Sequence, residues 1–158
     1  MILNFFFRKL WIESTPTILL EFHPHFHSSP IKIRYGETDQ MGVVHHSNYL
    51  RYLEVARLEW LQSLGVSYAQ MERQGVAMPV IKANLDYKVP ACFEDDIIVE
   101  IQLVQMPKVR ISFAYRIKNQ RQELVATAQT DLAFLDAKSR RPIRCPEEFS
   151  SLFSPFFD

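Results

Sequence analysis

The loop and helix start that decide the fold lie together in the stretch YGETDQMGVVHHSNY, residues 35–49. Up to His46 the stretch has no regular hydrophobic period. From Ser47 onward, apolar residues recur every three or four positions, which predicts the buried face of a helix about 17 residues long. Ser47 or Asn48 is expected as its N-cap, and Gly65 as the residue that ends it. The expected apolar face consists of Tyr49, Leu50, Leu53, Ala56, Trp60, Leu61 and Leu64.

Outside this helix the hydrophobic period is two, which is typical of half-buried strands. Residues 31–35 form a strand before the loop, and residues 67–74 add a short second helix. Four longer strands are expected at residues 78–89, 96–106, 109–119 and 123–136. Short turns join the neighbouring strands, so the sheet should be antiparallel. The predicted fold class is therefore α+β, with one long helix packed on the sheet.

The composition limits the class of protein. The 158 residues fit one domain, and 18 Lys+Arg balance 18 Asp+Glu. This balance argues against a nucleic-acid binder, which needs a basic excess to neutralise phosphates. No apolar run reaches the roughly 18 residues of a membrane span. Cys92 and Cys145 form neither a metal-ligand spacing nor a disulfide framework, and two incidental thiols fit a cytoplasmic protein.

The two ends differ from the rest of the chain. Residues 1–30 contain no Gly and carry His23, His25 and His27 at alternate positions. Alternate positions on a strand share a face, so these histidines form either a metal clip or a solvated segment. The second interpretation is favoured, and no metal site is expected. The aromatic tail, residues 150–158, either docks on the body, docks on a neighbouring subunit, or stays loose.

The loop before the long helix can bring an acid, an imidazole and backbone donors together. The first N–H groups of a helix lack internal acceptors and can hold an oxygen that becomes negative. Asp39 lies seven residues before His46, and Gly42 lets the chain approach a ligand closely. These groups suit acyl transfer to water. In the structural alternative, Asp39 bonds its own turn, His46 only starts the helix and Glu37 is solvated.

At this loop the chain resembles the 4-hydroxybenzoyl-CoA thioesterase family, and within it the YbgC-type acyl-CoA thioesterases. The motif consists of Tyr35, Thr38-Asp39, Gly42, Val43-Val44 and His45-His46. The resemblance continues through residues 48–57, 85–91 and 95–96. It covers residues 31–149, between the extension at 1–30 and the tail at 150–158.

The resemblance implies a hotdog fold, in which an antiparallel sheet wraps a central helix. In this family two subunits continue one sheet across a dimer, and they commonly assemble as homotetramers. The active site then lies between subunits. Tyr49, Trp60 or the strand at residues 78–89 is expected near the subunit boundary.

The resemblance also implies roles for single residues. Asp39 falls on the catalytic carboxylate, which acts as the nucleophile or as a general base on water. His46 falls on the position whose backbone N–H polarises the thioester carbonyl, and Tyr35 falls on a tyrosine that helps to shape the site. His45 departs from the family, which more often has Tyr or another aromatic residue there. Substrate contacts are expected from Gly42, Val44 and His45 and, for the phosphates of CoA, from Lys108, Arg110 and Arg141.

We therefore expect an acyl-CoA thioesterase that releases CoA and a carboxylic acid. It needs no metal or redox cofactor, because a positioned carboxylate suffices for thioester hydrolysis. The acyl group stays open, as does the choice between CoA and an acyl carrier protein. The alternative is a non-catalytic hotdog module that binds acyl-CoA or acyl carrier protein. A dehydratase is disfavoured, because no second pair of His and acid is visible.

Overall fold

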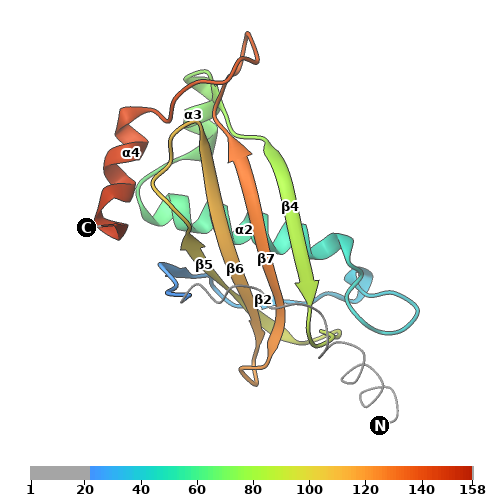
Figure 1. Ribbon diagram of the computed structural model, residues 1–158. Coiled ribbons are helices and arrows are strands. Elements are labelled where there is room, and N and C mark those ends of the chain that lie inside the picture. Colours follow the sequence, from blue (N-terminus) through green and yellow to red (C-terminus); the bar gives the residue numbers. More distant parts are fainter. Residues whose placement is uncertain (1–21, 158) are drawn as a thin grey trace.

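The computed structural model describes residues 22–157 (Figure 1). Most of the expected 1–30 extension, including its apolar run, lies outside the described residues. An antiparallel sheet crosses the long helix α2, Ser47–Ser63, which runs behind it in the figure. This is the α+β hotdog arrangement that the sequence and its resemblance predict.

The main sheet has the strand order β1-β5-β6-β7-β4, β2 also pairs with β5, and every pairing is antiparallel. A separate small sheet joins β3 and β8. The strands are β1 Phe26–His27, β2 Ile31–Lys32, β3 Val76–Ala77, β4 Val80–Tyr87, β5 Asp96–Leu103, β6 Arg110–Asn119, β7 Leu124–Ala133 and β8 Leu135–Asp136. The other helices are η1 Tyr35–Glu37, α3 Tyr68–Arg73, α4 Glu147–Phe153 and η2 Ser154–Phe156.

All five predicted strands are shorter in the structure, and the physical reason is visible for two of them. Residues 31–35 pair with β5 only over β2, because the backbone N–H of Arg34 donates to the Glu37 carboxylate at 2.9 Å and the chain turns into η1. The range 123–136 is divided at Phe134, whose ring is fully buried, so that β8 leaves the main sheet and pairs with β3.

α2 buries one face, but not with every expected residue. Trp60 is 1% exposed, and its ring meets that of Phe113 on β6 edge-on, with 5.7 Å between the centroids. Trp60 therefore lies in the hydrophobic core of the chain and not on its surface. Leu50, expected inside, is 43% exposed, whereas Arg57, expected outside, is only 7% exposed.

The two ends of α2 show one confirmed and one wrong prediction. Gly65 has a φ of +81°, in the left-handed region that favours glycine, and it follows the helix as predicted. The N-cap prediction is wrong, because the flanking residue is His46 and its side chain makes no cap. The Asn48 side chain instead donates to the backbone carbonyl of Glu37 at 2.8 Å.

Arg57 belongs to a buried polar chain that joins α2 to two strands. Its guanidinium donates to the Tyr115 hydroxyl on β6 at 3.1 Å, and that oxygen lies 2.8 Å from Thr130 Oγ1 on β7. Burial raises the pKa of Tyr115, so its phenol stays protonated at neutral pH. The three groups satisfy one another, as buried polar groups must.

The described parts of both chain ends pack on the body. β1 pairs with β5, so the sheet begins before the expected domain start at Ile31. Near the other end Phe153 is buried, and the Phe156 ring lies 5.5 Å from that of Trp60. The His25 ring stacks on Phe156 at 4.7 Å, which joins the two ends. The aromatic tail therefore docks on its own subunit.

His25 and His27, two of the three histidines of the first segment, contact different neighbours. His27 Nε2 lies 3.6 Å from the Glu100 carboxylate, whereas His25 stacks on the tail. Within residues 22–157, no three His, Cys, Asp or Glu side chains are arranged to hold a metal ion.

Within residues 22–157, no helix has the length and apolar character to cross a membrane. Both cysteines are free thiols, and Cys92 is exposed.

Replacing Tyr115 with Phe removes the hydroxyl that joins Arg57 to Thr130. We expect the free energy of unfolding to fall by about 1–3 kcal/mol, because both partners lose a bond in a buried place. Chemical denaturation measures the loss. Tyr35→Phe is the matched control, since Tyr35 is exposed and its change should stay within about 0.5 kcal/mol. Equal stabilities of wild type and Tyr115→Phe would contradict the structural role of the polar chain.

Candidate active site

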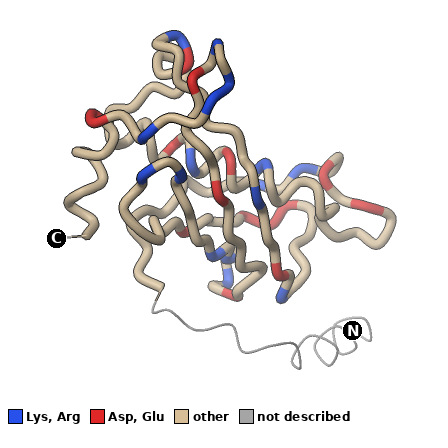
Figure 2. The backbone as a smooth tube through the Cα atoms, turned by 45° about the horizontal axis from the view of Figure 1, so that its top comes forward, with Lys and Arg blue, Asp and Glu red and all other residues tan. Residues whose placement is uncertain are grey.

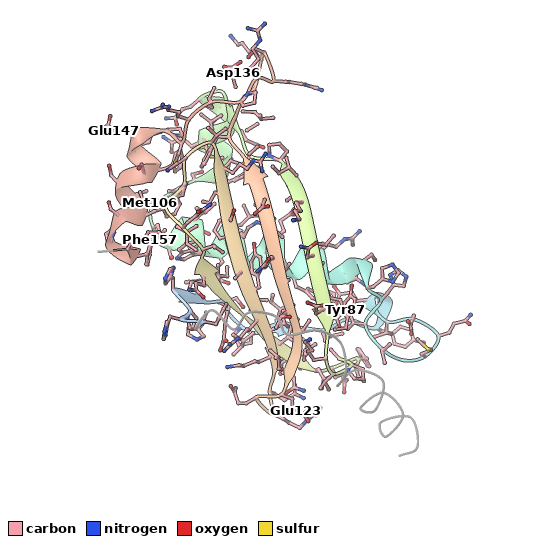
Figure 3. The ribbon with its side chains drawn as sticks, in the orientation of Figure 1. Tyr87, Met106, Glu123, Asp136, Glu147 and Phe157 are labelled. Atoms are coloured by element: carbon pink, nitrogen blue, oxygen red, sulfur yellow. The ribbon has the colours of Figure 1, made fainter. Side chains whose placement is uncertain are left out.

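An open cavity of about 210 Å³ lies at the start of α2. It is bounded by the loop before α2, by the first turn of α2 and by the segment after β4. Figure 3 shows Tyr87 at this end of β4, beside that loop. The lining residues are Asp39, Met41, Val43, Val44, His46, Tyr49, Tyr87, Lys88, Val89 and Pro90. A few polar groups thus face a largely apolar space, as in many ligand sites.

A tight loop places Asp39 in the cavity wall. Its backbone N–H donates to the Val43 carbonyl, and its carbonyl accepts from the Gly42 N–H, both at 2.9 Å. Gly42 has a φ of +75°, which favours glycine at this turn. Asp39 Oδ1 also accepts from the Met41 N–H at 2.8 Å, as the structural alternative predicts. The other oxygen, Oδ2, accepts no bond from the described residues and is available to a ligand.

Glu37 anchors this loop, although its carboxylate was expected to be solvated. Its side chain is 18% exposed and accepts from the Tyr52 hydroxyl and the Arg34 backbone N–H, both at 2.9 Å. Its backbone carbonyl accepts from the His45 N–H at 2.8 Å and from the Asn48 side chain. Burial and the bond to Glu37 raise the pKa of Tyr52. The sequence signal was Tyr52, three residues after Tyr49 on the buried face of α2.

The first backbone N–H groups of α2 are mostly taken by the two histidines before it. The Ser47 N–H donates to His45 Nδ1 at 3.3 Å, the Asn48 N–H to the His45 carbonyl at 3.0 Å, and the Tyr49 N–H to the His46 carbonyl at 3.4 Å. The N–H of His46 itself has no acceptor among the described residues. It is a free donor at the positive end of the helix dipole, next to the cavity.

Two tyrosines line the cavity opposite the loop, and sequence reasoning did not single them out as site residues. The rings of Tyr49 and Tyr87 meet edge-on, with 5.0 Å between their centroids. Burial and the neighbouring Tyr87 raise the pKa of Tyr49 to about 12, and burial raises the pKa of Tyr87. Both hydroxyls therefore stay neutral at physiological pH. Tyr87 and Lys88 lie in a segment that carries the family resemblance, and this was the available signal.

The structure gathers only some of the predicted site residues. Asp39, Val44 and His46 line the cavity, whereas Gly42 and His45 belong to the same loop without lining it.

Tyr35 does not line the cavity. It is 77% exposed, and its ring meets that of Phe93 edge-on at 5.6 Å. Its role in the site therefore stays a prediction from the resemblance.

The basic residues expected to meet CoA lie at the other end of the sheet. Arg110 pairs with the last residue of β7, whereas Tyr87 pairs near its start, roughly 20 Å away at about 3.3 Å per residue. Lys108 lies two residues before β6, and the Arg141 backbone carbonyl accepts from the N–H of Asp136, which Figure 3 shows far from Tyr87. Figure 2 shows Lys and Arg interleaved with Asp and Glu over the described chain. One subunit by itself does not bring these cations to Asp39.

Comparison with known proteins matches residues 33–153 to a family model described as the thioesterase-like superfamily. YneP of Bacillus subtilis (strain 168) is 34% identical over 125 residues, which cover 79% of this chain and 91% of YneP. The acyl-CoA thioesterase YbgC of Haemophilus influenzae is 30% identical over 127 residues, which cover 80% of this chain and 93% of YbgC.

Solved structures show the same fold. A DHNA-CoA thioesterase from Staphylococcus aureus superposes with a TM-score of 0.78 at 34% identity, covering 82% of this chain and 89% of that protein. The resemblance to YbgC-type thioesterases and the hotdog fold are thus confirmed. The family match includes the Asp39 loop, α2 and the four long strands that build the cavity. The chain belongs to the thioesterase-like superfamily.

Proposed function

We propose that this chain hydrolyses acyl-CoA thioesters to free CoA and a carboxylic acid. The observation that carries the proposal is the cavity at the start of α2, whose wall contains both the Asp39 carboxylate and His46. The free N–H of His46 adds a donor where negative charge must be held. The names of YbgC and of the Staphylococcus aureus structure support an acyl-CoA substrate.

The reaction follows from these groups. The thioester carbonyl oxygen takes a hydrogen bond from the His46 N–H, and the helix dipole stabilises the negative charge that develops on it. Asp39 then acts in one of two ways. As a nucleophile it attacks the carbonyl carbon, the C–S bond breaks, and water hydrolyses the resulting mixed anhydride. As a general base it takes a proton from a water molecule that attacks directly. Either route consumes one water and yields the acid and the CoA thiol.

This chemistry needs no metal or redox cofactor, because the carboxylate and water supply every bond change. An acyl carrier protein, which presents the same kind of thioester, is the alternative carrier of the acyl group. We propose the cytoplasm as the place of action, and the free thiols of Cys92 and Cys145 fit its reducing conditions.

We further propose that two subunits join through β4, and that two such dimers form a homotetramer. β4 ends the strand order, so its outer edge has no neighbour among the described residues. Ile81 on this strand is 49% exposed. An open edge with exposed apolar side chains is a template for pairing with another chain.

This dimer would also supply the cations that one subunit lacks. A two-fold axis makes the pairing of β4 with its copy antiparallel, so the Val80 end of one strand lies beside the Tyr87 end of the other. The partner subunit's Lys108 and the partner subunit's Arg110 then lie at the end of the joint sheet that holds Asp39. This placement supports their predicted contact with CoA phosphates.

Replacing Asp39 with Asn tests the proposed chemistry. The Asn oxygen can still accept from the Met41 N–H, so the turn should persist while the charge is lost. We expect kcat to fall by roughly 10²-fold or more, measured as thiol release from short, medium, long and aromatic acyl-CoAs. Glu147→Gln is the matched control, an exposed carboxylate on α4, which lies on the other side of the sheet from β4. A folded Asp39→Asn enzyme with unchanged kcat would refute the mechanism. If the wild type binds acyl-CoA tightly but does not hydrolyse it, the non-catalytic binding module is favoured instead.

Replacing His46 with Ala separates the ring from the backbone donor. The ring lines the cavity, so its loss should lower kcat on the order of 10²-fold, more than it raises KM. Steady-state kinetics on the best acyl-CoA of the panel measure both constants. A change in KM alone would mean that the ring only contributes to binding.

Replacing Ile81 with Glu puts a charge on the open edge of β4. We expect monomers in light scattering where wild type is oligomeric, together with loss of thioesterase activity, because the site is incomplete in one subunit. Val104→Glu is the control, since Val104 is also exposed but follows β5. An Ile81→Glu protein with wild-type mass and activity would place the interface elsewhere.

A further inference from the structure

The imidazole of His45 acts as a hydrogen-bond acceptor at the start of α2. The Ser47 backbone N–H donates to His45 Nδ1 at 3.3 Å, and Ser47 Oγ lies 2.8 Å from the same nitrogen. A backbone N–H can only donate, so Nδ1 must be unprotonated. The ring is therefore the neutral tautomer with its proton on Nε2, and the Ser47 hydroxyl is a second donor to it.

This contact replaces the usual helix cap. Helices normally begin with a Ser, Thr, Asp or Asn oxygen that accepts a first-turn N–H. Here His46 flanks the helix and its side chain makes no such bond. His45 instead binds two first-turn donors, with Nδ1 on Ser47 and its carbonyl on the Asn48 N–H at 3.0 Å. The order of the helix start therefore depends on an imidazole nitrogen that can accept these bonds only while it carries no proton.

The same ring lies against the proposed catalytic histidine. The His45 and His46 rings have centroids 4.0 Å apart and are tilted by 35°. His46 lines the cavity, whereas His45 does not, so His45 supports His46 from outside the cavity. The charged or titratable groups that line the cavity with His46 are Asp39, Tyr49, Tyr87 and Lys88, and the backbone carbonyl of Glu37 accepts from the His45 N–H at 2.8 Å.

We propose that His45 is a positioning residue: its neutral ring caps α2 and holds His46, and thereby aims the free His46 N–H at the thioester oxygen. This role rests on the proposed function of the same site. Protonation of Nδ1 removes the acceptor for Ser47, because an imidazolium only donates. It also puts positive charge at the positive end of the helix dipole and against the His46 ring.

Three variants separate the cap from the ring contact. His45→Asn keeps an acceptor that cannot be protonated, His45→Phe keeps an aromatic ring without an acceptor, and His45→Ala keeps neither. We expect Phe and Ala to lower kcat about tenfold with little change in KM, as loss of a cap implies. The Asn variant should stay near the wild-type kcat at neutral pH. His27→Asn on β1, at the opposite edge of the sheet, is the control histidine.

The pH dependence gives a readout that a packing role would not move. The cap needs an unprotonated Nδ1, so toward acid the wild type should lose kcat that His45→Asn, whose acceptor cannot be protonated, retains. NMR of the protein without substrate tests the cap directly. The His45 Nδ1 signal should show an unprotonated nitrogen at neutral pH, and the Ser47 amide signal should shift as that nitrogen titrates. Thermal unfolding confirms that each variant is folded.

The outcomes distinguish this role from its rivals. A fully active His45→Phe would show that the ring contact suffices and would overturn the cap. Effects on KM alone would make His45 a substrate contact. A protonated Nδ1 at neutral pH would also overturn the proposal. If wild type hydrolyses no acyl-CoA, the proposed function fails, and the NMR titration still decides whether His45 caps α2.

Discussion

The apolar face of α2 is buried by packing on the sheet. This contact determines where in the molecule the first turn of α2 lies. Trp60 and Leu53 are fully or almost fully buried there, which fixes the helix along its length. Its first turn consequently lies beside the Tyr87 end of β4 and the loop that carries Asp39. The residues His46 and Asp39 line the same cavity because burial of the apolar face fixes the position of the helix.

Polar groups along α2 serve two opposite purposes. In its middle, Arg57, Tyr115 and Thr130 satisfy one another out of contact with water, so they contribute to stability and are closed to ligands. At its start, Glu37 ties the loop to the helix, and most first-turn donors are already bonded. Among the backbone N–H groups of residues 46–49, only that of His46 has no acceptor in the described residues. An unpaired donor is costly in a dry core, but at an open cavity water can satisfy it until a substrate oxygen arrives.

The sheet itself is unfinished at β4. A strand in the interior of a protein is paired on both sides, whereas the outer edge of β4 and its apolar side chains face solvent in one subunit. The same subunit holds Asp39 at one end of the sheet and the candidate CoA-binding cations at the other. One symmetric pairing would resolve both features, because two-fold symmetry reverses the strand direction. The proposed dimer would thus link assembly to catalysis through the geometry of a single edge strand.

The sequence by itself determined the span of α2, its end at Gly65 and the presence of the four long strands. These features depend on hydrophobic period and on turn chemistry, which are local. Burial of Arg57 and Glu37 and the exposure of Tyr35 were not predictable, because each depends on segments distant in the chain. Only the tertiary structure decided that residues 87–90 face the Asp39 loop, and that Lys108, Arg110 and Arg141 do not. Strand register sets those distances, and register is a property of pairing between segments.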